Sequence, residues 1–222
     1  MRLLWRELER RGIEYTDATV VGDALISRAR SIVASAFLRS DADVLLSIDS
    51  DIWFRPQDAI SLCEKADGII AALYMTRSLN TQPALMLPSK PVTMGPESEP
   101  VEVPFASTGF MAVERKVFEA LSGVLPLCHQ GWSDRGADTS FWPFYMPYTI
   151  PWEGDGHMYL SEDWAFCQRA KDAGFKVWLD PQVRLGHMGT TMFTLEDLIR
   201  EPKPEAQVIT LARRDDGTLD IS

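Results

Sequence analysis

A short apolar run that ends in two carboxylates constrains this chain more than any other feature. Residues 44–48 (VLLSI) form an apolar block bounded by polar residues, which is typical of a strand buried on both faces. Asp49 and Asp51 follow this run at once. Open α/β sheets bind ligands beyond the carboxyl ends of such strands, and residues two apart on an extended backbone point the same way. The run therefore predicts an α/β fold in which two carboxylates are directed at one point.

This pair of carboxylates fits two interpretations. Carboxylate oxygens suit a hard divalent cation, which such sites typically share with the phosphates of a substrate. A solvated acidic turn is the alternative, because two aspartates separated by one residue often arise by chance.

Periodicity along the rest of the chain predicts alternating helices and strands. Helical patterns cover residues 3–11, 26–38 and 115–121, and two more begin at residues 56 and 161. Apolar strands are expected at residues 69–74, 107–113 and 175–179. A strand, a helix and a second strand in succession over residues 44–74 predict parallel strands. We therefore expect a mixed, mostly parallel sheet flanked by helices.

Two segments interrupt this pattern. Residues 80–104 contain six prolines, so we expect a loop there with short edge strands at most. Residues 128–159 are dense in aromatic residues, prolines and glycines, which indicates a long excursion over the surface. Long loops in compact domains are often functional, although these aromatic side chains could instead simply hold the loop in place.

Length, charge and cysteine content limit the class of protein. The 222 residues are enough for one domain (1–200) followed by a polar, loosely attached tail (201–222). The net charge of −10 argues against nucleic acid as a partner, and an anionic substrate would need a metal or a few arginines to bind. No stretch approaches the roughly eighteen apolar residues of a membrane span, and the charged start is unlike a signal peptide. Three widely spaced cysteines indicate a reducing, cytoplasmic setting.

Four stretches, taken in order, resemble the GT-A glycosyltransferases, which use nucleotide-sugar donors. They are residues 24–30 (ALISRAR), 46–51 (LSIDSD), 107–111 (STGFM) and 160–164 (LSEDW), the last continuing to His187. No single motif is specific, and it is their order over residues 3–190 that carries the resemblance. The resemblance implies the GT-A, Rossmann-like fold and a single glycosyltransferase domain.

The resemblance also implies a donor and metal site. Asp49, Ser50 and Asp51 would bind the nucleoside-diphosphate sugar with Mn²⁺ or Mg²⁺ on its diphosphate, and His187 would complete the metal site. Two carboxylates and one imidazole leave coordination positions open for phosphate and water, and nitrogen ligation favours Mn²⁺ over Mg²⁺. A purely structural histidine after a strand is the alternative for His187.

The acceptor side is implied in the same way. Glu162 and Asp163 would face the acceptor, with Asp163 as the catalytic base in an inverting reaction. Gly109, Trp152 and Trp164 fall on this side as well. Sugars present apolar faces to aromatic rings, which makes an exposed tryptophan a suitable platform. The acceptor, whether a glycan, a lipid-linked molecule or a protein, is left open, as are the sugar, the stereochemical outcome and the oligomeric state.

Arg28 and Arg30 are candidates for contacting the nucleotide or its diphosphate, since guanidinium groups suit phosphate oxygens. A solvated helix face is the alternative for both. The family's first strand and its loop, which form part of the nucleotide pocket, have no counterpart before the first helix of this chain. The resemblance therefore leaves recognition of the base and ribose open.

Two other functions compete with a glycosyltransferase. One is a catalytically impaired module of the same fold that binds a nucleotide sugar without turnover. The other is a phosphatase like the haloacid dehalogenases, which also place two aspartates after a buried strand. Their motif requires Thr or Val two positions past the second aspartate, where this chain has Trp53.

Overall fold

The structure is a computed structural model of the chain. It describes residues 1–77, 81–129, 140–152, 154–189, 192–198, 209–213 and 219–221. Parts of two predicted segments lie outside the described residues, namely 130–139 and 153 of the aromatic loop and 201–208, 214–218 and 222 of the tail.

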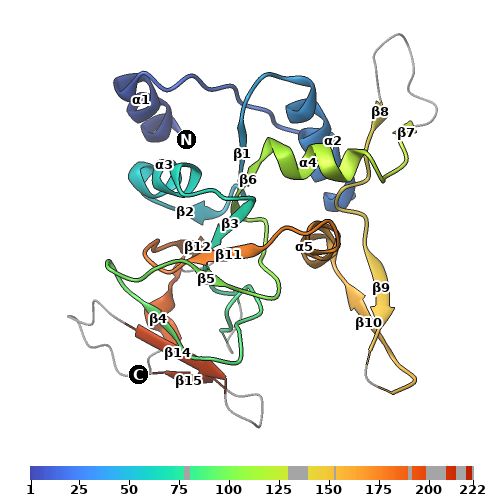
Figure 1. Ribbon diagram of the computed structural model, residues 1–222. Helices are drawn as coiled ribbons and strands as arrows, with labels where there is room; N and C mark the ends of the chain where they lie inside the picture. The colour runs from blue at the N-terminus through green and yellow to red at the C-terminus, as the bar shows by residue number, and fades with distance from the viewer. Residues whose placement is uncertain are drawn as a thin grey trace.

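A five-stranded sheet forms the centre of the molecule (Figure 1). In spatial order its strands are β1 (Val44–Ile48), β6 (Phe110–Glu114), β3 (Ile69–Ala72), β11 (Val177–Asp180) and β5 (Val101–Glu102). β6 is antiparallel to both β1 and β3, β11 is parallel to β3, and β5 is antiparallel to β11. The strands β1, β3 and β11 therefore run in one direction.

The predicted α/β class is confirmed, but the sheet is only partly parallel. β1 and β3 run in the same direction, as the strand–helix–strand pattern predicted, yet they are not neighbours. β6 lies between them, so that β3 and β11 form the one parallel pair of this sheet among the described residues.

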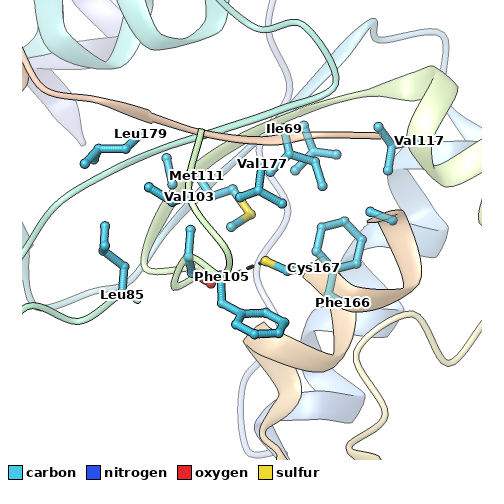
Figure 2. Close-up of a cluster of buried hydrophobic side chains, with 14 of the residues drawn as sticks. Ile69, Leu85, Val103, Phe105, Met111, Val117, Phe166, Cys167, Val177 and Leu179 are labelled. Atoms are coloured by element: carbon cyan, nitrogen blue, oxygen red, sulfur yellow. Dashed lines mark hydrogen bonds between the residues drawn. The ribbon is translucent and has the colours of Figure 1, made fainter. Parts of the chain in front are cut away.

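Alternate residues of the strands face two separate cores, because successive side chains of a strand point to opposite faces. Ile69 and Ala71 of β3 belong to one buried cluster, and Ile70 and Ala72 belong to the other. Figure 2 shows the first cluster, in which strand residues such as Val177 meet side chains from the helices.

Helices cover both faces of the sheet (Figure 1). α1 (Arg2–Arg11) and α3 (Pro56–Glu64) pack on one face, and α2 (Ile26–Arg39), α4 (Arg115–Ser122) and α5 (Glu162–Asp172) pack on the other. Proline begins α3, where its missing N–H removes no helical hydrogen bond. α1 ends at Gly12, whose φ of 68° is a left-handed conformation that glycine adopts without strain. None of the helices in the described ranges has the length and apolar character that a membrane span requires.

Short strands form the periphery. One three-stranded sheet consists of β13 (Met192–Phe193), β12 (Gly186–Met188) and β2 (Ile52–Trp53), and another of β15 (Leu219–Ile221), β14 (Ile209–Arg213) and β4 (Val92–Met94). Two hairpins pair β9 (Tyr148–Pro151) with β10 (His157–Leu160) and β7 (Cys128–His129) with β8 (Ser140–Phe141). A 3₁₀ turn, η1, spans Leu195–Leu198. β14 thus joins part of the predicted tail to the body of the protein by backbone pairing with β4.

The predicted aromatic loop divides into a buried part and an exposed part. Phe144 and Tyr145 are buried in the core beneath α5, where the Tyr145 ring stacks on Phe166 with centroids 4.5 Å apart. Trp152 and Tyr159, on the hairpin of β9 and β10, are exposed. Packing therefore accounts for Phe144 and Tyr145, whereas Trp152 and Tyr159 place the hairpin of β9 and β10 at the surface.

Candidate active site

The candidate site lies at the sheet edge where β1 and β3 end and the antiparallel β6 begins. Ile48 pairs with Phe110, and the N–H of Asp49 donates to the Gly109 carbonyl at 2.9 Å. This pairing aligns the carboxyl end of β1 with residues 107–109. The N-terminus of α5 reaches the same edge, and β12 reaches it by pairing with β2, where His187 lies opposite Ile52.

Arg30, on α2, is at the centre of this cluster. Its Nη1 donates to Asp163, to the Thr108 hydroxyl at 3.0 Å and to Glu162 at 3.2 Å. Its Nη2 lies 3.1 Å from both carboxylate oxygens of Asp49. One guanidinium thus joins the end of β1, the start of β6 and the start of α5.

Burial shifts the proton equilibria of this cluster. Burial raises the pKa of Asp163 above its ordinary value and outweighs the opposing effects of Arg30 and the Thr108 hydroxyl, which donates to it. Burial works against the cation of Arg30, but the charges of Asp163 and Asp49 more than offset it and raise the Arg30 pKa. A carboxylate whose pKa is raised toward neutrality is better suited to accept a proton in a reaction near pH 7.

Asp51 and His187 form the second part of the site. His187 Nδ1 lies 2.7 Å from the Met75 carbonyl oxygen, which accepts hydrogen bonds only, so Nδ1 carries the proton. In the neutral ring the lone pair is then on Nε2, which faces Asp51 Oδ2 at 3.5 Å. The ring of Tyr74 packs edge-on against the imidazole with centroids 5.1 Å apart. Nε2 and Asp51 Oδ2 therefore face each other, and a proton or a cation between them would satisfy both.

The two aspartates do not point at one place, contrary to the expectation for an extended backbone. The chain turns after Asp49, and the N–H of Ile52 donates to the Asp49 carbonyl at 3.1 Å. Asp49 is consequently directed toward Arg30, and Asp51 toward His187 and Arg77. In the described part of the chain no three metal-ligating side chains are gathered closely enough to hold an ion, so the ligand set that includes Asp49 stays a prediction.

Arg77, just beyond β3, is a member of the site that the sequence did not single out. Its Nη1 lies 2.8 Å from Asp51 Oδ2, the same oxygen that faces His187, and donates to the Met188 carbonyl at 3.3 Å. The position of Arg77 could have been predicted, because β3 runs in the same direction as β1. The residues that follow β3 therefore reach the same edge of the sheet as Asp49 and Asp51.

Gly109 allows the wall of the site to close. A Cβ at this position would lie 2.5 Å from the Tyr74 hydroxyl, far below van der Waals contact, and 3.0 Å from Asp49 Oδ2, a tight contact. Burial raises the pKa of Tyr74, and the charges of Asp163 and Asp49 raise it further, so the phenol remains protonated. Gly109 therefore supports the site by its lack of a side chain.

The remaining predicted residues lie at the margins of the cluster. Arg28 donates from two nitrogens to Asp23, each at 2.8 Å, and Ser50 is exposed in the turn after β1. Trp164, in the first turn of α5, stacks on Phe105 with centroids 4.9 Å apart and is partly buried. Trp164 thus packs against the core, and its place on the acceptor side stays a prediction.

Trp152 is 53% exposed and lies at the turn of the β9–β10 hairpin, where its N–H donates to the Gly156 carbonyl at 3.0 Å. Strand β10 leads directly into Glu162, so the base of this hairpin is at the site. Trp152 lies at the opposite end of the hairpin, just past Pro151 and its strand partner His157.

Thr108 and Tyr145 are further residues that sequence reasoning missed. Thr108 is fully buried and bridges Arg30 and Asp163. Its place beside Gly109, within residues 107–111 that resemble the family, could have indicated it. Tyr145 is buried between α2 and α5, and its hydroxyl has no hydrogen-bond partner among the described residues. Burial raises the pKa of Tyr145, and Arg30 lowers it in part. No local pattern marked Tyr145, because only the packing of two distant helices places it there.

Comparisons with known proteins add little to this geometry. No family model matches the chain, and no curated protein matches it. Among solved structures, the crystal structure of A197 from STIV is similar, with a TM-score of 0.45 and 15% sequence identity over 99% of this chain and 86% of that one. A likeness at this level carries no argument about function.

Proposed function

We propose that this protein is a metal-dependent glycosyltransferase that moves a sugar from a nucleoside-diphosphate sugar to an acceptor hydroxyl. The observation that carries the proposal is one juxtaposition at the sheet edge. Asp51 Oδ2 and His187 Nε2 face each other at the same sheet edge as Asp163, a buried carboxyl whose pKa is raised. The first arrangement suits a divalent cation and the second suits a base, which are the two groups that such a transfer needs.

Two of the residues present, Asp51 and His187, could each supply one ligand to a divalent ion, with donor phosphate and water completing its shell. The Met75 carbonyl fixes the proton of His187 on Nδ1, as backbone carbonyls commonly do for metal-binding histidines, and leaves Nε2 as a ligand. Asp51 supplies an oxygen beside it, and the imidazole nitrogen favours Mn²⁺ over Mg²⁺. Asp49 remains only a proposed ligand, because Arg30 donates to both of its oxygens and would compete with an ion there. When bound, the ion would polarise the donor diphosphate as a Lewis acid.

Asp163 is the proposed base. It would take the proton of the acceptor hydroxyl as that oxygen bonds to the anomeric carbon and the bond to the diphosphate breaks. Arg30 and Thr108 fix the carboxylate in position through their hydrogen bonds. Glu162, which also contacts Arg30, would orient the acceptor, and we place the acceptor (a glycan, a lipid-linked molecule or a protein) beside the start of α5.

A module that binds a nucleotide sugar without turnover is the second candidate, and one observation favours it. The same Asp163 oxygen, Oδ1, accepts hydrogen bonds from both Arg30 and Thr108. A carboxylate engaged in this way is a weaker proton acceptor than a free one. This module would share the metal and donor site and would differ only in turnover.

Release of sugar from a nucleotide-sugar panel, measured with Mn²⁺ and with a chelator, separates the two candidates. An enzyme is expected to release sugar to water slowly, in a reaction that requires the metal and is lost in Asp51→Ala. The matched control is Asp67→Ala, which removes an exposed carboxylate paired with Lys116 away from the site. Metal-dependent binding without release would favour the binding module, and absence of both would contradict the proposal.

The cysteines agree with a cytoplasmic setting, which we include in the proposal. Cys63, Cys128 and Cys167 all lie in described ranges and are free thiols. Burial raises the pKa of the Cys63 and Cys167 thiols to about 12, so neither ionises at neutral pH.

A further inference from the structure

The candidate site has more carboxylates than cations, which opposes the binding of a diphosphate. Its charged side chains are the carboxylates Asp49, Asp51, Glu162 and Asp163 and the guanidinium groups Arg30 and Arg77. A donor diphosphate is itself anionic, so a divalent ion on Asp51 would not by itself remove the repulsion from the other carboxylates. A side-chain cation that can reach the phosphates is needed as well.

Two of the arginines near this edge are already committed. Arg30 is only 13% exposed, and both its Nη atoms bind carboxylates of the cluster. Arg28 donates from two nitrogens to Asp23 at 2.8 Å each. For either to bind phosphate, an existing ion pair would have to break, and for Arg30 this would disrupt the contacts that position Asp163.

Arg77 differs from both in exposure and in partner. Its side chain is 47% exposed, and its Nη1 lies 2.8 Å from Asp51 Oδ2. His187 Nε2 faces this same oxygen at 3.5 Å. An ion held between Asp51 and His187 would therefore compete with Arg77 for one oxygen atom, and two cations at one oxygen repel each other.

We propose that Arg77 is the exchangeable cation of this site, and the proposal rests on the proposed function. In the free protein Arg77 neutralises Asp51. When a divalent ion binds Asp51, the guanidinium leaves that oxygen and binds the phosphate oxygens of the donor, to which its planar set of donors is well matched. Arg77 thus opposes binding of the metal alone and favours binding of the metal together with a diphosphate.

The test is calorimetry on the purified full chain with two probes, Mn²⁺ alone and inorganic pyrophosphate at saturating Mn²⁺. For Arg77→Gln we expect the affinity for Mn²⁺ alone to rise about two- to fivefold, because an exposed ion pair is a weak competitor. We expect the affinity for pyrophosphate to fall about tenfold or more, because a charge-assisted hydrogen bond is lost. A loss of solubility or of global folding would not produce these opposite signs.

Two further variants sharpen the result. Arg77→Lys keeps the charge and should retain most of the competition with Mn²⁺ while recovering only part of the pyrophosphate affinity, since an ammonium cannot form two parallel hydrogen bonds. Arg55→Gln is the matched control, because Arg55 is 57% exposed and pairs at 2.8 Å with Asp58 at the start of α3 instead of with a residue of the site. It should change neither affinity.

The outcomes distinguish this inference from the proposed function. If the wild-type protein binds both probes and Arg77→Gln binds them with unchanged affinity, the role of Arg77 is wrong and the proposed function stands. If Arg77→Gln binds Mn²⁺ more weakly, Arg77 supports the metal instead of competing with it, which also overturns the inference. If the wild-type protein binds neither probe, the proposed function fails and the inference fails with it.

Discussion

Arg30 and Asp163, 133 positions apart in the chain, are joined by a hydrogen-bonded ion pair at the centre of the site. The pair connects α2 to the first turn of α5, and the Thr108 hydroxyl at the start of β6 contacts both side chains. Two helices on one face of the sheet and the start of β6 are thereby held in a fixed relation at the edge where β1 ends. Changes at Asp163 should consequently affect both stability and chemistry.

The first prediction concerns Asp163 as base. A positioned base typically contributes about 10²- to 10⁴-fold to a rate, so Asp163→Asn should reduce single-turnover transfer at saturating donor by roughly that factor. Donor affinity should change little. Glu162→Gln is the comparison, since it removes a neighbouring carboxylate from the same helix turn and should have a smaller effect. A loss below about fivefold in Asp163→Asn, or a product with retained anomeric configuration, would refute the assignment of the base.

The second prediction is a pH dependence of stability. Burial raises the folded-state pKa of Asp163 above the unfolded value of about 3.9, so the folded protein binds this proton more tightly. The resulting stability is fully present below the unfolded pKa and is lost as the pH rises through the folded pKa. Denaturant unfolding at pH 4 and pH 7 should therefore show wild type losing stability relative to Asp163→Asn over this interval. A wild-type protein that gains on the variant would mean that Arg30 dominates and the Asp163 pKa is lowered.

The third prediction concerns Gly109. A Cβ there would meet the Tyr74 hydroxyl at 2.5 Å and Cζ at 2.7 Å, and Tyr74 is buried and cannot easily move aside. Gly109→Ala should therefore destabilise the protein by about 1–3 kcal/mol, the usual cost of overpacking, and also weaken donor binding. Gly123→Ala is the control, because the nearest atom to its Cβ would be 3.4 Å away. Equal denaturation midpoints for the two variants would contradict the predicted clash.

A fourth prediction concerns the β9–β10 hairpin. If the hairpin forms the acceptor side, Trp152→Ala should impair transfer while leaving folding and metal-dependent donor binding unchanged, because the side chain is half exposed. Phe144→Ala, in the buried part of the same segment, should instead cost about 3–5 kcal/mol of stability. Full transfer activity in Trp152→Ala would remove Trp152 from the acceptor side.

Local elements could be predicted because their signals are local. The apolar run of β1, the proline at the start of α3 and the periodicity of α2 all predicted the elements that the structure contains. The position of β6 between β1 and β3 could not be predicted, since it depends on pairings such as Leu46 with Ala112 that lie far apart in the chain. The helical connection between β1 and β3 predicted that the two strands run in the same direction. It did not predict that another strand lies between them.

The site shows the same division between local and long-range information. The end of the apolar run predicted that Asp49 and Asp51 lie at the carboxyl edge of the sheet. Ligands of α/β sheets bind at this edge. The different directions of their side chains follow from the turn closed by Ile52, which the period of an extended strand does not describe. The ion pair between Arg30 and Asp163 depends on how α2 and α5 pack, and no sequence pattern within either helix specifies it.

The central claim is a divalent-ion site shared with a nucleoside diphosphate, and thermal unfolding tests it most directly. A ligand that binds only the folded state raises the melting temperature by mass action, so Mn²⁺ and a nucleoside diphosphate together should raise it far more than the sum of their separate effects. Asp51→Ala should abolish this synergy and His187→Ala should weaken it, while Asp67→Ala should leave it intact. Equal synergy in wild type and Asp51→Ala, or none in wild type for any nucleoside diphosphate, would contradict the account.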